Sequence, residues 1–214
     1  MYQYILFDLD GTLIDSEEGI TESAAYALSK FGIIEAPKNL RHFIGPPLFR
    51  SFSLFYGFDE EKSAKAVEYY REYFGEKGVY MNTVYEGVKT LLQDLRDAGK
   101  TLILATSKYE YYAKMILDDL GFSPYFAFAA GSLKDGGRGT KAEVISYVLK
   151  EMNVSDLSSA VMIGDRMHDI EGAQTVGIDS VGVLWGFGSR EELTSHGATY
   201  IAQDTDALAE ILRE

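Results

Sequence analysis

The sequence predicts an α/β fold in which a doubly wound parallel sheet, Rossmann-like in character, carries an inserted α-helical segment. Short apolar runs predict the strands: residues 4–7, 101–105, 126–129, 160–163 and 180–184, with a shorter candidate at 200–202. These runs do not alternate with polar residues, which indicates strands that are covered on both faces. Helical patterns lie between them, and strands that alternate with helices are typical of a doubly wound sheet.

The helical patterns have recognisable ends. Val88, Leu91, Leu92 and Leu95 form an apolar stripe that Gly99 closes, and a further stripe closes at Gly121. A third stripe, from Val144 to Leu149, follows Thr140, which is a suitable N-cap residue.

Residues 15–81 break the alternation of strands and helices. They contain helical patterns, including a stripe that ends at Gly32, one that Pro47 opens and one that Asp59 caps, but no convincing strand. We therefore expect a Rossmann-like core of residues 1–14 and 82–214, and a helical cap domain of residues 15–81.

Composition narrows the classes of partner. The chain of 214 residues has 33 acidic and 20 basic side chains, a net charge of −13, and no Cys. Such a negative field disfavours nucleic acid and anionic membranes as partners. Asp8 and Asp10 interrupt the early apolar stretch, so we expect neither a secretory signal nor a membrane helix, and a cytoplasmic protein. The sequence leaves open whether it is a monomer or a homodimer.

Polar side chains follow three of the predicted strands. Asp8 and Asp10 come at the end of the first strand, Thr106 and Ser107 at the end of the second, and Asp165 after the run 160–163. Ligands of an open parallel sheet bind outside the carboxyl ends of its strands. We therefore expect these residues to meet in one crevice.

The acids favour magnesium. Gly11 offers a bend that brings Asp10 back over the site, and carboxylates so close repel unless a cation joins them. Asp8, the Asp10 carbonyl and Asp165 form an oxygen-rich set that suits Mg²⁺. Zn²⁺ normally calls for His or Cys, and His168 is the one histidine near these acids.

The same residues suit phosphoryl transfer. Asp8 is already ionised and can attack phosphorus, while Asp10 can protonate the leaving oxygen and later deprotonate water. Thr106 and nearby backbone N–H groups can hold phosphate oxygens. Lys141, directly after Thr140, brings positive charge to a helix N-terminus, and Asp169 can orient Lys141 or the waters of a metal ion.

Four ordered motifs make the sequence resemble the haloacid dehalogenase superfamily. They are Asp8-Leu9-Asp10-Gly11-Thr12-Leu13, Thr106-Ser107-Lys108, Lys141, and Gly164-Asp165-Arg166-Met167-His168-Asp169. The chain looks similar to the phosphoglycolate phosphatase-like branch, which also contains 5′-nucleotidases, pyrophosphatases and β-phosphoglucomutases. The segment 43–48 resembles the part of the cap that faces the active site in such enzymes and reads the leaving group.

The resemblance implies a magnesium-dependent phosphatase that hydrolyses a small phosphorylated metabolite, such as phosphoglycolate or a nucleoside monophosphate, through a phospho-aspartate on Asp8. It implies Asp10 as acid and base, Thr106 and Lys141 as phosphate holders with Gly11 and Ser107 beside them, and Asp165 as a metal ligand with Asp169 behind it.

The sequence departs from the family pattern at two positions. Ala142 stands where many members have Pro after the Lys, which leaves Lys134 as a competing candidate. The dehalogenases lack the second acid, Asp10, which favours phosphoryl transfer here.

Other functions are compatible with the same residues. A β-phosphoglucomutase-like phosphomutase or a pyrophosphatase fits the same motifs, and a phospho-accepting receiver-type signalling domain clusters similar residues, although it has no reason to carry a helical lid. We expect His168 to lie at the surface or behind the metal ligands, and Arg50 to be a surface cation, with a substrate contact as the alternative. We expect Tyr69, Tyr70 and Tyr73 to belong to the core and the interface of the cap, and residues 186–188 to be a plain loop. The physiological substrate is left open.

Overall fold

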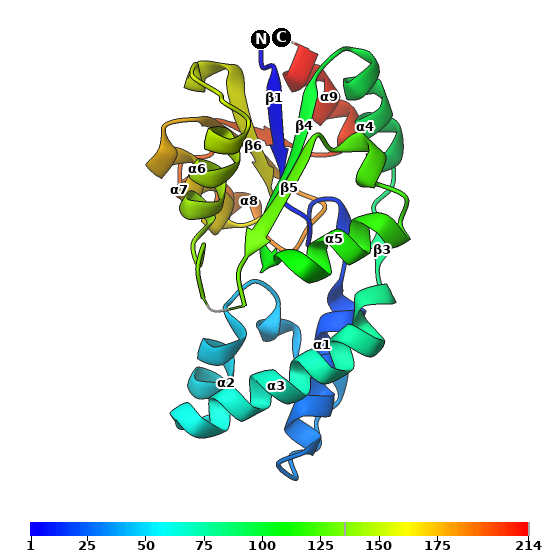
Figure 1. Cartoon of the computed structure of the whole chain (residues 1–214), viewed down its shortest axis with the longest axis vertical. Helices are drawn as coiled ribbons and strands as arrows, with labels where there is room; N and C mark the ends of the chain where they lie inside the picture. The colour runs from blue at the N-terminus through cyan, green and yellow to red at the C-terminus, as the bar shows by residue number, and fades with distance from the viewer. Residues whose placement is uncertain (135, 214) are drawn as a thin grey trace. The chain divides into compact units, whose positions relative to one another are not determined.

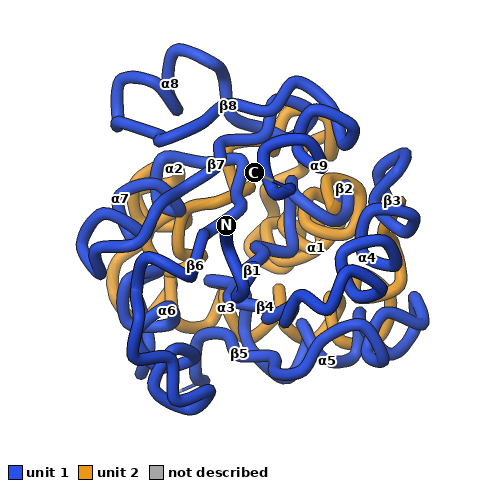
Figure 2. The backbone as a smooth tube through the Cα atoms, turned by 90° about the horizontal axis from the view of Figure 1, so that it is seen from above, with its two compact units in different colours: residues 1–15, 84–214 blue, residues 16–83 orange. Residues whose placement is uncertain are grey.

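The computed structural model describes residues 1–134 and 136–213, which form two compact units. The first unit, the core, comprises residues 1–15 and 84–213 of the described chain, and the second comprises residues 16–83 (Figure 2). The core strands are β1 (Tyr4–Phe7), β4 (Thr101–Tyr109), β5 (Phe128–Ser132), β6 (Ala160–Gly164), β7 (Asp179–Val183) and β8 (Tyr200–Ala202). The core helices are α4 (Val88–Asp97), α5 (Glu110–Asp119), α6 (Lys141–Glu151), α7 (Met167–Val176), α8 (Arg190–Ser195) and α9 (Thr205–Arg213). Two short strands, β2 (Ile14–Asp15) and β3 (Thr83–Val84), pair with each other.

The core confirms the predicted α/β fold. Its six strands are parallel and lie in the order β5-β4-β1-β6-β7-β8, with β1 near the centre (Figure 1). Phe7 of β1 is level with Leu104 of β4 and Ile163 of β6. The residues that follow these three positions therefore lie close together toward the carboxyl edge of the sheet.

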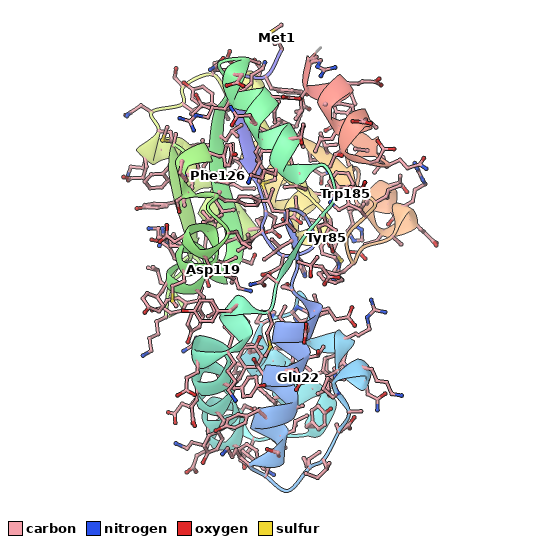
Figure 3. The ribbon with its side chains drawn as sticks, turned by 90° about the vertical axis from the view of Figure 1, so that its right-hand side faces the viewer. Met1, Glu22, Tyr85, Asp119, Phe126 and Trp185 are labelled. Carbon is pink, nitrogen blue, oxygen red and sulfur yellow. The ribbon has the colours of Figure 1, made fainter. Side chains whose placement is uncertain are left out.

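Helices cover both faces of the sheet. Viewed from above, α6 and α7 lie on one face, and α4, α5 and α9 lie on the other (Figure 2). Leu6 packs in the cluster beneath α6 and α7, together with Ile103 and Met162. Phe7 points to the opposite face and meets Phe126, labelled in Figure 3, edge to face at 6.3 Å. This two-sided burial is why the strands appear in the sequence as continuous apolar runs.

Two strand boundaries differ from the prediction. The run 126–129 forms a strand only from Phe128 onward, and Phe126 instead caps a 3-10 turn at Ser123–Tyr125. The strand expected at 101–105 continues to Tyr109, but its register with β5 shifts between Ala105 and Tyr109. Regular pairing of β4 with β5 therefore stops at Ala105, just before Thr106 and Ser107.

The N-terminus of α6 has the predicted cap. Thr140 Oγ1 accepts a hydrogen bond from Glu143 N at 3.3 Å, and the Glu143 carboxylate accepts one from Thr140 N at 3.0 Å. This reciprocal capping box fixes the residue at which α6 begins. Lys141 is consequently the first residue of the helix.

The second unit is helical. It contains α1 (Glu17–Ser29), α2 (Leu48–Tyr56) and α3 (Glu60–Glu76), with 3-10 turns at Pro37–Asn39, Arg41–Phe43 and Gly78–Tyr80. Asp59 caps α3 by accepting a hydrogen bond from Lys62 N at 2.8 Å. The tyrosines of α3 pack inside the unit, since Tyr70 is buried and stacks on Phe74, and Tyr73 contacts the Tyr26 ring. Across the described residues, no helix combines the length and the hydropathy that a bilayer crossing requires.

Replacing Leu6 by Ala tests the two-sided packing of β1. Leu6 has no exposed surface, so Leu6→Ala is expected to lower the free energy of unfolding by about 2–5 kcal/mol through lost burial and the remaining cavity. Leu157→Ala, at a position that is 37% exposed in the same unit, is the matched control and is expected to cost about 0.5 kcal/mol or less. Urea denaturation measures both. Equal losses in the two variants would contradict the packing described.

Candidate active site

The nucleophile candidate Asp8 lies at the carboxyl end of β1. Asp8 N donates to Ile163 O at 2.9 Å, which continues the pairing of β1 with β6 by one residue. The chain then turns at Gly11, which has a φ of +75°. A Cβ atom on Gly11 would lie 2.1 Å from Asp165 Oδ2, so the position requires glycine for its backbone conformation and for space.

Lys141 lies between two of the acids. Its Nζ is 2.9 Å from Asp8 Oδ1 and 2.7 Å from Asp169 Oδ1, and it donates to the carbonyl of Ala105 at 3.1 Å. The side chain is 3% exposed. The competing candidate, Lys134, is exposed and makes no such contact in the part of the chain described. Lys141 is therefore the lysine that the fold brings to the acids.

Asp165 is fully buried directly after β6. Its Oδ2 accepts a hydrogen bond from Phe187 N at 2.7 Å, whereas its Oδ1 is buried and has no hydrogen-bond partner among the described residues. Asp169, in the first turn of α7, accepts from Arg166 N at 3.1 Å through the oxygen that does not contact Lys141. Both oxygens of Asp169 are thus engaged by protein groups, and one oxygen of Asp165 is not.

The acids suit a divalent cation. Asp8, Asp165 and Asp169 each offer an oxygen atom, and these three atoms lie within 4.8 Å of one another. Three ionised carboxylates around one ammonium leave two uncompensated negative charges. An all-oxygen set with a buried, unpartnered oxygen matches the preference of Mg²⁺. The Asp10 carboxylate, by contrast, is not in this cluster.

The crowding shifts the pKa values of Asp8, Asp165 and Lys141. Burial raises the pKa of Asp8 to about 6, although the neighbouring Lys141 ammonium acts to lower it. Burial and the charges of Asp169 and Asp8 also raise the pKa of Asp165. Burial alone would lower the pKa of Lys141, but the carboxylates of Asp169 and Asp8 raise it above its usual value. Lys141 therefore stays charged, while the acids gain from a cation.

The two residues expected from β4 have different environments. Thr106 is buried, its hydroxyl accepts a hydrogen bond from Lys108 N at 3.2 Å, and its side chain acts, against the effect of burial, to lower the pKa of Asp8. Ser107 is exposed. The structure thus brings Thr106 to Asp8 and leaves the Ser107 residue at the surface of the unit.

The sequence did not predict two supporting features. Lys108 Nζ contacts both carboxylate oxygens of Asp10, at 2.9 and 3.0 Å. The segment 186–188, expected to be a plain loop, packs on Asp165, because a Cβ atom on Gly186 would lie 2.4 Å from Asp165 Cβ and one on Gly188 would lie 1.9 Å from the Asp165 carbonyl oxygen. Two glycines flanking one residue were the available signal for a close approach.

Trp185 and His168 complete the surroundings. Trp185, labelled in Figure 3, donates from Nε1 to the Thr12 carbonyl at 3.0 Å and so ties β7 to the turn after β1. His168 is half-buried and is not in the acid cluster, and burial together with Arg166 lowers its pKa. Arg50, in the second unit, is exposed.

Comparison with known proteins places these residues in a family. The model of the haloacid dehalogenase-like hydrolases matches residues 5–183. A protein named 5′-nucleotidase from Pseudomonas aeruginosa is 44% identical over 99% of this chain and 96% of its own length. The tyrosine-protein kinase PtkA of Mycobacterium tuberculosis is 38% identical over 98% of this chain and 72% of its own.

A solved structure is similar throughout. The crystal structure described as "a predicted phosphatase" from Clostridium acetobutylicum has a TM-score of 0.94 and 46% identity, and each chain is covered over 100% of its length. The family match spans most of the chain, from β1 to β7, and it includes the acids at the carboxyl ends of β1 and β6. The chain therefore belongs to the haloacid dehalogenase-like hydrolase family.

Proposed function

We propose that this protein is a magnesium-dependent phosphatase that hydrolyses a small phosphate monoester through a phospho-aspartate on Asp8. One observation carries the proposal: Asp8 lies 2.9 Å from the buried ammonium of Lys141 and beside Asp165, whose buried Oδ1 has no hydrogen-bond partner among the residues that the structure describes. A carboxylate nucleophile, a fixed positive charge and a vacant oxygen ligand are the groups that phosphoryl transfer requires.

The residues divide the reaction among them. Mg²⁺ held by Asp8, the Asp10 carbonyl and Asp165, with Asp169 behind them, would neutralise charge on the phosphate. Asp8 attacks phosphorus as the bond to the leaving oxygen breaks, and Asp10 supplies a proton to that oxygen. Water then attacks the phosphorus of phospho-Asp8, gives a proton to Asp10 and releases phosphate. Lys141 and Thr106, with the backbone of Gly11 and Ser107, hold the phosphate oxygens.

We propose that residues 16–83 act as the cap and supply specificity for the leaving group. The segment 43–48 is the part of this unit that resembles the substrate-facing segment of related enzymes, and Arg50 and the exposed Phe49 follow it on α2. The 44% identity to a protein named 5′-nucleotidase makes nucleoside monophosphates the first substrates to assay, before phosphoglycolate and pyrophosphate. The net charge of −13 and the fold further favour a cytoplasmic enzyme of small metabolites over a partner of nucleic acid or membranes.

A kinase-like or phosphomutase-like activity is the second candidate, because the chain is 38% identical to a protein named tyrosine-protein kinase. In either case the phosphoryl group of phospho-Asp8 goes to a hydroxyl group instead of water. The fate of the phosphate separates the candidates: a phosphatase yields free phosphate, whereas a transferase yields a new ester. A receiver-type signalling domain would instead keep a long-lived phospho-Asp8 with negligible turnover.

Asp8→Asn tests the covalent mechanism. The amide cannot attack phosphorus, so phosphate release from nucleoside monophosphates in Mg²⁺ is expected to fall at least about 10⁴-fold, to background. Acid-quenched wild-type enzyme incubated with substrate is expected to carry one phosphoryl group on the peptide that contains Asp8, detected by mass spectrometry. Asp119→Asn, at a carboxylate on the far end of α5, is the control and is expected to retain wild-type turnover. Wild-type turnover in Asp8→Asn would refute the mechanism.

Magnesium is expected to stabilise the fold more at pH 7.5 than at pH 5. Since the folded-state pKa of Asp8 is raised to about 6, the proton competes with the metal at the lower pH. Without metal, in EDTA, Asp8 affects stability in the opposite direction. Its raised pKa stabilises the folded state below the unfolded pKa of about 4, and this contribution is lost as the pH rises through about 6. Thermal unfolding with Mg²⁺ and with EDTA at the two pH values measures the difference.

Asp165→Asn provides the matched control for the metal. It keeps the shape of the side chain but removes the charge of the buried ligand, so the Mg²⁺-dependent increase in Tm is expected to shrink at both pH values. An equal increase at pH 5 and pH 7.5, or an increase that Asp165→Asn does not reduce, would place the metal elsewhere.

A further inference from the structure

Lys108 and Asp10 form an ion pair beside the candidate site. Lys108 Nζ lies 2.9 Å from Oδ1 and 3.0 Å from Oδ2 of Asp10, so one ammonium group contacts both oxygens of the carboxylate. The two side chains are 9% and 21% exposed, respectively. An ammonium group at nearly equal distances from both oxygens restrains the position of the carboxylate and keeps both oxygens turned toward Lys108.

The backbone that carries Lys108 is itself held on two sides. The register of β4 and β5 shifts between Ala105 and Tyr109, and such irregularities re-aim side chains near active sites. Lys108 N donates to Thr106 Oγ1 at 3.2 Å. On the other side, a Cβ atom on Gly131 of β5 would lie 2.3 Å from the Lys108 carbonyl oxygen. Gly131 therefore allows β5 to pack directly on this backbone.

Asp10 needs such support because of where it lies. It stands between β1 and the turn at Gly11, and its side chain is more exposed than that of Asp8, at 21% against 12%. A partly exposed carboxylate samples several rotamers, and ordering it costs free energy. A group that must reach the leaving oxygen in one step and a water molecule in the next is efficient only when its orientation is fixed.

We propose that Lys108 is a positioning residue that orients the Asp10 carboxyl group for both proton transfers. This inference rests on the proposed phosphatase mechanism. In the first step the bond from Asp8 Oδ to phosphorus forms, the bond to the leaving oxygen breaks, and the Asp10 proton moves to that oxygen. In the second, the bond from water to phosphorus forms, the bond from Asp8 Oδ to phosphorus breaks, and a water proton moves to Asp10. The sum is an ester plus water giving an alcohol plus phosphate.

The orientation of Asp10 affects the rate of phosphorylation more for a basic leaving group than for a stabilised one. Phenyl phosphate releases a basic phenolate that requires a proton, whereas p-nitrophenyl phosphate releases an anion that its nitro group stabilises. Loss of Lys108 should therefore slow phosphorylation of Asp8 more for phenyl phosphate than for p-nitrophenyl phosphate. Hydrolysis of phospho-Asp8 should slow equally for both, since the phosphoenzyme is the same. A general loss of structure would slow both esters alike.

The test compares Lys108→Met and Lys108→Arg with wild type by rapid quench in Mg²⁺, using these two esters. We expect Lys108→Met to phosphorylate Asp8 at least ~10-fold more slowly relative to wild type with phenyl phosphate than with p-nitrophenyl phosphate, and to hydrolyse phospho-Asp8 ~100-fold more slowly. With p-nitrophenyl phosphate it should then show a burst of p-nitrophenolate before slow turnover. Lys108→Arg retains a cation and is expected to recover much of both rates.

Lys114→Met is the matched control. Lys114 also forms a lysine–carboxylate ion pair, with Glu110 at 2.5 Å, but it is 50% exposed on α5, and its replacement is expected to leave both rates unchanged. A raised KM with unchanged kcat in Lys108→Met would make Lys108 a substrate contact and overturn the inference, as would equal slowing of the two esters. If Lys108→Met unfolds, Lys108→Gln, which also lacks the charge, takes its place: slower phosphorylation of Asp8 by phenyl phosphate than by p-nitrophenyl phosphate, relative to wild type, supports the inference, and wild-type rates overturn it. Absence of phosphoenzyme in the wild type would instead overturn the proposed function.

Discussion

The crowding of buried carboxylates around one ammonium group is the constraint on which the rest of the site depends. Asp8, Asp165 and Asp169 lie within reach of one another, and Lys141 contacts two of them from the first turn of α6. Such a cluster is costly without a compensating cation, because each carboxylate has left water. The fold accepts that cost at the carboxyl edge of the sheet. A divalent cation, which we propose binds here, would offset that cost.

Close approach of backbone holds the crowded groups in place. Gly11, Gly164, Gly186 and Gly188 each stand where a Cβ atom would collide with Asp165 or Asp169. The segment 186–188 donates a hydrogen bond to Asp165 from Phe187 N, and Trp185 anchors it to the turn after β1. These contacts join elements that are far apart in the chain. They fix one oxygen of Asp165, and the other has no hydrogen-bond partner among the described residues.

The sequence was sufficient for the fold and for the set of acids. Continuous apolar runs identified the strands because both faces of the sheet are covered, and Thr140, as a suitable N-cap residue, placed Lys141 at the start of a helix. The sequence was insufficient where the role of a side chain depends on a contact with residues far away in the chain. The pairing of Lys108 with Asp10 depends on the register shift in β4, and the packing of residues 186–188 on Asp165 depends on the course of a loop. Neither leaves a periodic pattern.

The most direct test of the central claim is a crystal structure with Mg²⁺ and beryllofluoride, which mimics an acyl phosphate on a carboxylate. The account predicts beryllium bonded to the carboxylate of Asp8, fluorine atoms facing Lys141 and Thr106, and Mg²⁺ bound to Asp165 at about 2.1 Å. Beryllofluoride attached to any other side chain, or Mg²⁺ that does not contact Asp165, would contradict it.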